Sequence, residues 1–217
     1  MPQEILEAAK AGDSERVRVL VAGGASMDAA DSGWRSAAWW AAHNGHAEVV
    51  RVLGALGARV GAPDAQDETP EQAAERRGHR AVCALLRELA TGRALLDAAQ
   101  AGNTAAVHAL LSARGVDVDA ADAGGNSAAW FAACGGHVEV LRALGDCGAQ
   151  LDVPNRLGQT PFFVACANGH LDALCLLHAR GARLDAEDRQ GQTPASYASR
   201  NANAGVVRTL KELAQQR

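Results

Sequence analysis

The chain of 217 residues is 48% hydrophobic but only 4% aromatic, and its formal net charge is −4. A core built from this composition must consist mostly of Ala, Val and Leu. No apolar run reaches the roughly 18 residues that a membrane span requires, and the charged N-terminus lacks the apolar stretch of a secretory signal. The acidic balance, with no Lys/Arg run longer than Arg76-Arg77, argues against nucleic-acid binding. We therefore expect a chain that binds neither membranes nor nucleic acid.

The cysteines indicate the compartment. Their number is odd and no C-x-x-C spacing occurs; they are Cys83, Cys134, Cys147, Cys166 and Cys175. This pattern argues against a disulfide framework and favours a reducing compartment, the cytoplasm or else the nucleus. Cysteine buried as a small apolar side chain is the usual case, so we expect no zinc site.

Residues 36–50 and 127–141 share one pattern, SAAWWAAHNGHAEVV and SAAWFAACGGHVEVL. The pattern predicts two short helices joined by a glycine turn. A Ser or Thr hydroxyl stands at the N-cap of the first helix, and in weaker copies Pro follows it at the first helical position. Gly45 and its equivalents permit the left-handed backbone that a tight helix exit needs. Apolar residues at helical spacing, such as Val49 and Leu53, predict the second helix.

In chain order, copies of the pattern recur every 33 residues, as the spacing from Asn155 to Asp188 illustrates. Residues 94–111 restart the opening of the chain, because ALLDAAQAGNTAAVHALL is similar to EILEAAKAGDSERVRVLV at 4–21. We expect about seven repeats, arranged as a block of three (1–92) followed by a block of four (93–217). The expected repeats are 1–30, 31–63, 64–92, 93–121, 122–154, 155–187 and 188–217.

The two blocks meet between Ala90 and Arg93, where the chain is too short for another turn segment. We expect one helix over Ala81–Leu89 before this junction and another over Ala94–Ala101 after it. The blocks either stack continuously with one turn segment missing or meet at a kink. Continuous stacking is favoured because Ala94–Ala101 is apolar enough to need a cover. Either way, we expect the junction to be the weak point, since coupling in a linear array depends on each interface in turn.

A 33-residue unit of turn plus two helices resembles the ankyrin repeat. The T-P-L-H-x-A-A-x-x-G-H signature of that family stands here as TPFFVACANGH, SAAWWAAHNGH and SAAWFAACGGH. Two copies depart from it with Ser-Ala in place of Thr-Pro, and none keeps the first His of the signature. The resemblance implies an all-α helical solenoid with short turn or hairpin fingers. It also implies a concave groove, formed by the turns and the first helices, in which protein partners bind.

No residue constellation indicates catalysis. The sequence lacks the G-x-S-x-G, H-E-x-x-H, G-x-G-x-x-G and phosphate-loop spacings. Four histidines recur one per repeat, but stacked repeats would hold them about 10 Å apart, too far to share the ~2 Å bonds of one metal. We expect these residues to join their glycine turns by hydrogen bonds; they are His46, His79, His137 and His170. The expectation is no enzyme, no cofactor and no metal site.

Carrying the variable positions of the ankyrin repeat over to this chain gives a candidate partner-binding set. It contains Trp34, Arg35, Trp39, His43, Asn44, Arg76, Arg77, Trp130, Cys134, Arg156, Phe163, Arg189 and Arg200. The variable positions contain six arginines and only one acid, Glu68. The expected groove is therefore basic, although the chain as a whole is acidic. Either the arginines are scattered by chance, or the groove suits an acidic partner.

Aromatic residues add an apolar anchor to this hypothesis. Trp39 and Trp130 each precede another candidate by four residues, so each shares a helix face with it. We expect Trp39, Trp130 and Phe163 to border the groove, with Trp40 and Phe131 pointing into the stack. The alternative for the two tryptophans is packing between repeats. Trp34 stands at a turn position where the family has glycine, and tryptophan is enriched in binding hot spots.

The sequence therefore predicts a protein–protein interaction scaffold or adaptor, monomeric, whose partner carries an acidic segment and an apolar anchor. The alternative is a structural or targeting subunit of a larger assembly, such as a substrate-recruiting arm. An adaptor would capture a peptide motif in isolation, whereas a structural subunit would co-purify in fixed stoichiometry.

Overall fold

The computed structural model describes residues 2–113, 116–200 and 204–215, and every regular element in these ranges is a helix. Residue contacts divide the chain into unit 1, residues 1–91, and unit 2, residues 92–217. The sequence had suggested a boundary one residue later. None of the helices in the described ranges combines the length and hydropathy that crossing a bilayer requires.

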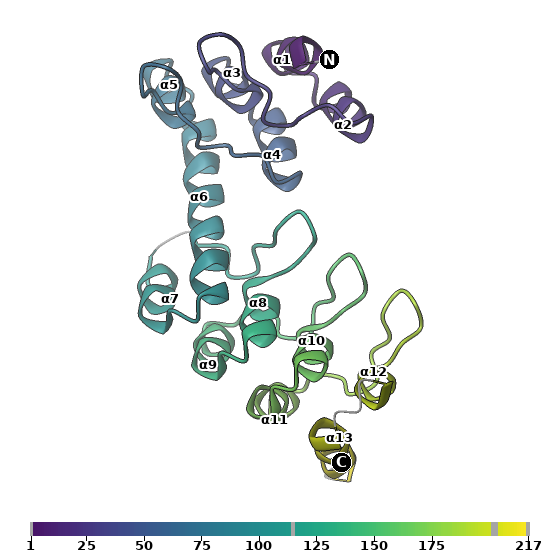
Figure 1. Cartoon of the computed structure of the whole chain (residues 1–217). Coiled ribbons are helices and arrows are strands. Elements are labelled where there is room, and N and C mark those ends of the chain that lie inside the picture. Colours follow the sequence, from purple (N-terminus) through teal and green to yellow (C-terminus); the bar gives the residue numbers. More distant parts are fainter. Residues whose placement is uncertain (1, 114–115, 201–203, 216–217) are drawn as a thin grey trace. The chain divides into compact units, whose positions relative to one another are not determined.

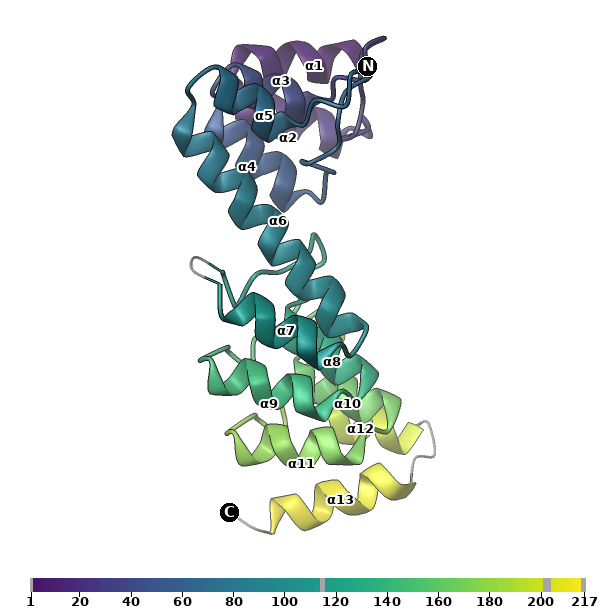
Figure 2. The ribbon, with the colours of Figure 1, turned by 90° about the vertical axis from the view of Figure 1, so that its left-hand side faces the viewer.

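Helices follow one another in pairs, and glycine turns join the two helices of each pair from α1 to α11 (Figure 1). Unit 1 contains α1 (Pro2–Ala11), α2 (Ser14–Ala22), α3 (Ala37–His43), α4 (Ala47–Ala55), α5 (Pro70–Arg76) and the start of α6 (Arg80–Gln100). Unit 2 contains the end of α6, then α7 (Thr104–Leu111), α8 (Ala128–Gly135), α9 (Val138–Asp146), α10 (Pro161–Asn168), α11 (Leu171–Ala179), α12 (Pro194–Arg200) and α13 (Ala204–Ala214). Figure 2 shows α9, α11 and α13 in a row along unit 2.

Helix α6 corrects the expectation at the junction. The sequence placed separate helices over Ala81–Leu89 and Ala94–Ala101, but the backbone is helical without a break from Arg80 to Gln100. Gly92 is buried in this helix, and a Cβ there would lie 3.0 Å from the Cβ of Ala120. Glycine at this position therefore lets α6 lie directly against residue 120.

Side-chain hydroxyls cap the N-terminus of the first helix of a pair at the residues that the sequence predicted. Ser36 Oγ accepts a hydrogen bond from the backbone N–H of Trp39 at 3.1 Å, and Thr160 Oγ1 accepts one from Phe163 at 3.1 Å. Thr69 forms a reciprocal capping box with Gln72. Each such cap stabilises its helix by about 1 kcal/mol.

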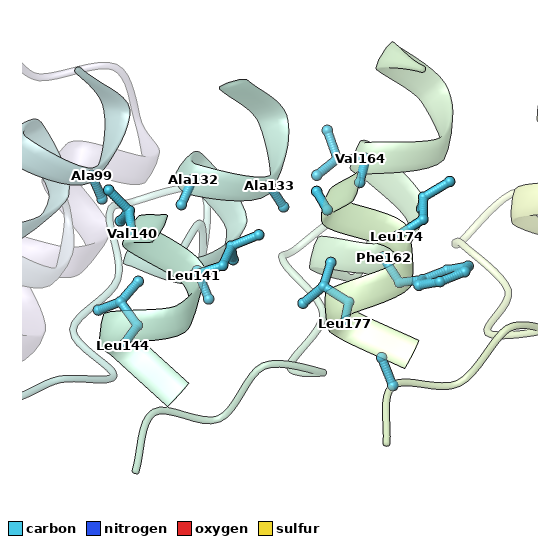
Figure 3. Close-up of a cluster of buried hydrophobic side chains, with 14 of the residues drawn as sticks. Ala99, Ala132, Ala133, Val140, Leu141, Leu144, Phe162, Val164, Leu174 and Leu177 are labelled. Atoms are coloured by element: carbon cyan, nitrogen blue, oxygen red, sulfur yellow. The ribbon is translucent and has the colours of Figure 1, made fainter. Parts of the chain in front are cut away.

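The core of unit 2 lies between neighbouring helix pairs and is built mainly from small and branched aliphatic residues (Figure 3). Ala132 and Ala133 of α8 are fully buried, as are Leu141 of α9 and Phe162 of α10. Because the alanines add so little bulk, α8 can pack closely against both α9 and α10. Unit 1 has a separate core of the same composition, which includes Ala41 and Ala42.

A histidine before the second helix bonds back to the preceding helix pair. The Nε2–H of His170 donates to the carbonyl of Cys134 at 2.9 Å, and its ring lies on Gly136, where a Cβ would come within 2.6 Å of Nδ1. The same contact occurs between His46 and Lys10, His79 and His43, and His137 and Gln100. The hydrogen-bonding role expected for these histidines is therefore confirmed, and each bond joins two successive pairs.

We call the segments before α3, α5, α8, α10 and α12 fingers. Each finger is closed by a side-chain oxygen of Asp or Asn. Asp122 Oδ1, for example, accepts the N–H groups of Gly124 and Asn126, both at 2.8 Å. The same double contact is made by Asp31, Asp64, Asn155 and Asp188. Adjacent fingers are also joined, since the N–H of Arg156 donates to the carbonyl of Gly124 at 2.9 Å. The finger tips are therefore held in fixed positions within each unit.

The histidine contact can be tested at Gly136. Gly136→Ala should lower the free energy of unfolding by about 2–3 kcal/mol, because it adds left-handed strain and also displaces the His170 ring. Gly148→Ala is the matched control, because Gly148 has a φ of 85° but no atom within 4 Å of an added Cβ. It should cost only the strain of about 1–2 kcal/mol. Equal losses in urea unfolding would show that the histidine contact contributes nothing.

The weak point expected at the centre of α6 can be tested by hydrogen exchange. Amides of residues 88–95 should exchange faster than those of 130–145, because Glu88, Ala90, Arg93 and Ala94 are all exposed and exposed backbone hydrogen bonds open at low free energy. Equal protection of the two segments would contradict a weak point at the centre of α6.

Candidate partner-binding surface

Trp34 lies at the first finger tip of unit 1 in a strained and exposed conformation. Its side chain is 69% exposed, and its φ is 60°. The equivalent positions in unit 2 are glycines with φ of 77°, 82° and 70°, namely Gly125, Gly158 and Gly191. A left-handed residue other than glycine costs roughly 1–2 kcal/mol. No packing inside the unit explains a tryptophan here, because most of the ring faces solvent.

Trp40 is half-buried against the core of unit 1, and two cations contact its ring. Lys10 Nζ lies 4.7 Å and Arg35 Cζ 4.6 Å from the centroid of its ring, and its Nε1–H donates to Asp31 Oδ2 at 3.2 Å. Burial raises the pKa of Asp31, but hydrogen bonds from the backbone and side chain of Arg35, from Gly33 and from Trp40 outweigh it and lower the pKa overall. Arg35 is thus neutralised by the acid of its own finger.

Two aromatic residues predicted to border the groove are buried, which corrects the prediction that their side chains line it. Trp39 is 3% exposed, because its ring stacks on His43 and its Nε1–H donates to the Glu68 carbonyl at 3.2 Å. Phe163 is 1% exposed and packs against Tyr197, with ring centroids 5.5 Å apart. In both cases the next helix pair covers the ring, which is the packing alternative considered for Trp39.

His43 and Arg77 form a contact that requires a neutral imidazole. Arg77 Nη2 donates to His43 Nε2 at 2.7 Å, and His43 Nδ1 is buried without a hydrogen-bond partner. Burial, and then the positive charges of Arg77 and Arg76, hold the pKa of His43 below its usual 6.5. Arg76 itself pairs with Glu68 at 2.8 Å. Among the candidate arginines of unit 1, Arg35 and Arg76 are therefore engaged by carboxylates and Arg77 by His43.

In unit 2, the remaining candidates of the first helices are half-buried. Trp130 packs edge to face on Phe131, with centroids 5.4 Å apart, and its buried Nε1 has no partner. Phe131 is also half-buried rather than enclosed in the stack. Cys134 accepts a hydrogen bond from Asn168 Nδ2 at its carbonyl, 2.9 Å away, and a weaker one at Sγ. These side chains are packed within the surface of the unit and are only partly accessible to a partner.

The exposed candidates of unit 2 lie at the finger tips and at the end of α12. Arg156, Arg189 and Arg200 are exposed, and none has a carboxylate partner among the described residues. Leu157 lies beside Arg156 and is 61% exposed. Leu157 is also one of the variable positions of the repeat, and it is apolar where the other fingers carry Gly or Gln. The sequence analysis missed Lys10, whose contact with Trp40 depends on the tertiary structure.

No group of three His, Cys, Asp or Glu side chains among the described residues could hold a metal ion. Burial raises the pKa of the Cys166 thiol to about 12, which keeps it protonated and unreactive. A shallow hollow in unit 1 is lined by Gln3, Glu4, Glu7, Ala8, Ala11, Asp13 and Arg16. It contains none of the predicted partner-binding residues.

The family model described as ankyrin repeats (three copies) matches residues 5–93, 95–188 and 147–216. No curated protein sequence matches the chain.

The neutral state of His43 predicts a pH dependence. Above a pH of about 6.5 the imidazole is neutral in both states; below it, the unfolded chain binds the proton first, so the free energy of unfolding should fall with pH until the lowered pKa of the folded state is reached. His43→Gln should reduce this slope in unfolding measured between about pH 8 and pH 5. His108→Gln, at an exposed histidine of α7, is the control. An unchanged slope in His43→Gln would refute the assignment.

Proposed function

Because this chain belongs to the ankyrin repeat family, we propose that it is a protein-interaction scaffold or adaptor that binds its partner at the finger tips and the open edges of the first helices. Repeats of this family are generally protein-interaction modules and are typically not catalytic. We further propose about seven repeats in a block of three and a block of four, because the sequence of the chain opening recurs near the division between the two units.

The conformation of Trp34 is the observation that carries the proposal. Strained backbone persists where the surrounding structure enforces it, and it is concentrated at functional sites. Here a tryptophan is held in solvent on a strained backbone. The strain and the exposed apolar surface both lower the stability of the fold. An exposed tryptophan at the rim of a polar surface is the kind of residue that dominates binding energy. We therefore assign Trp34 as the apolar anchor of unit 1, a role that the buried Trp39 cannot fill.

Charge supports an acidic segment in the partner. Arg77 in unit 1 and Arg156, Arg189 and Arg200 in unit 2 are exposed and have no carboxylate partner within the described residues. Such charges mainly accelerate association and select the partner, while the apolar anchor supplies affinity.

The free thiols support a reducing compartment. All five cysteines are unpaired, and Cys147 and Cys175 are exposed. Exposed free thiols persist where glutathione and thioredoxin keep them reduced. We propose the cytoplasm or the nucleus as the location, and a monomer as the free state.

Replacing Trp34 separates stability from binding. Trp34→Gly should raise the free energy of unfolding by about 0.5–1 kcal/mol by removing the left-handed strain. It should also reduce partner capture from a cell extract by about tenfold or more, if the ring acts as a hot spot. The measurements are urea unfolding and affinity capture quantified by mass spectrometry.

The matched control is Asp67→Gly. Asp67 is the equivalent residue of the next finger, exposed and with a φ of 59°. The change should give a similar gain in stability and leave capture intact. Partners retained in full by Trp34→Gly would overturn the proposal, and partners recovered in fixed stoichiometry with both variants would favour a structural or targeting subunit.

A further inference from the structure

We propose that the finger tips of unit 2 bind an extended acidic segment of a partner protein that carries one aliphatic side chain. The contact surface, here called the tip patch, consists of Arg156, Leu157 and Arg189. This inference rests on the proposed protein-binding function and names the partner chemistry of one part of the chain.

Interactions between fingers hold the three residues of the tip patch together. The N–H of Arg189 donates to the carbonyl of Leu157 at 2.8 Å, and the N–H of Arg156 donates to the Gly124 carbonyl at 2.9 Å. A Cβ at Gly158 would lie 2.8 Å from the Arg189 nitrogen, so the two tips are in direct backbone contact. The arginines therefore flank Leu157 on adjacent fingers of the same unit, each on a backbone that is already fixed.

The arginines of the tip patch differ from most of the described arginines of unit 2, although Arg200 likewise lacks a carboxylate partner there. Arg180 pairs with Asp146 at 2.6 Å and Arg183 with Asp152 at 3.0 Å. Arg142 pairs with Glu139 of its own helix at 3.5 Å. Arg156 and Arg189 have no such partner among the described residues and project their charge into solvent. A partner carboxylate can engage them without first breaking an internal ion pair.

The substitution at position 155 makes the tip patch more positive. Four fingers are closed by an Asp carboxylate, but Asn155 makes the same two backbone contacts, to Leu157 at 2.9 Å and Gln159 at 3.0 Å, without a charge. The negative charge that lies beneath the other tips is therefore missing beneath Arg156 and Leu157. The exposed acids Asp185 and Glu187 precede Asp188 in the last finger and lie outside the four-residue tips.

Leu157 gives the patch an apolar contact and thereby determines the kind of partner. A fully basic surface would suit any polyanion, including phosphate, whereas here Leu157, the residue next to Arg156, is 61% exposed. The side chains behind the tips are amides, and two of them are already engaged, since Asn126 Nδ2 donates to Asp122 Oδ2 and Gln192 Nε2 donates to Gln190 Oε1. The third, Gln159, can donate to and accept from an extended backbone. Carboxylates on both sides of one aliphatic residue would match both the charges and the leucine. A nucleic acid offers no aliphatic counterpart to Leu157.

The test is selection of displayed random peptides on the full-length protein, followed by fluorescence anisotropy with the most enriched peptide. Enriched peptides should be acidic with one aliphatic residue. Arg156→Gln/Arg189→Gln should weaken binding by about tenfold or more, and Leu157→Ser by about fivefold. Arg142→Gln/Arg208→Gln is the charge-matched control, because it removes the same two charges from exposed positions on α9 and α13. It should change affinity by less than about twofold.

Three results would overturn the proposal: enriched peptides that are neutral or basic, peptides that bind Arg156→Gln/Arg189→Gln as well as wild type, or no enrichment at all. Peptides lost on Trp34→Gly but kept by the double arginine variant would support the protein-binding function and reject the tip patch. Tighter binding of single-stranded DNA than of the acidic peptide would assign the arginines to a polyanion instead.

Discussion

At four positions, the stacking of successive helix pairs depends on the same contact, an imidazole laid on a glycine. His46, His79, His137 and His170 each donate to a carbonyl at the end of an earlier first helix. The ring occupies the space that a Cβ would need, at Gly12, Gly45, Gly102 or Gly136. That glycine must also adopt a positive φ to end its helix. One residue therefore meets two constraints, and this couples helix termination to the spacing between pairs.

The fixed spacing has a consequence for the finger tips. Each finger is closed by its own Asp or Asn and is bonded to its neighbour through the backbone. Little conformational freedom remains to be lost when a partner binds, and preorganised surfaces use more of their contact energy as affinity. The same rigidity explains how Trp34 can be held in a left-handed conformation, since the finger around it supplies the stabilising interactions.

The two units carry different chemistry on the same framework. In unit 1, Arg35 and Arg76 are neutralised by Asp31 and Glu68, and the exposed tip residue is aromatic. In unit 2, the tips carry amides in place of those charges and two arginines without internal partners. A single partner with distinct aromatic-binding and acidic segments, or two partners, would be consistent with this division of chemistry.

The sequence alone determined the elements of this protein, because they follow from local rules. The caps at Ser36 and Thr160, the glycine exits and the period of the histidines are each set within a few residues, and all were predicted. Tertiary structure decided which side chains are exposed. Trp39 and Trp40 are adjacent in sequence, yet the first is covered by the next helix pair and the second is half-buried with its ring in contact with Lys10 and Arg35. Packing likewise decided the continuity of α6 through Gly92. Glycine often marks the end of a helix, but this one lies inside the helix and is covered by Ala120.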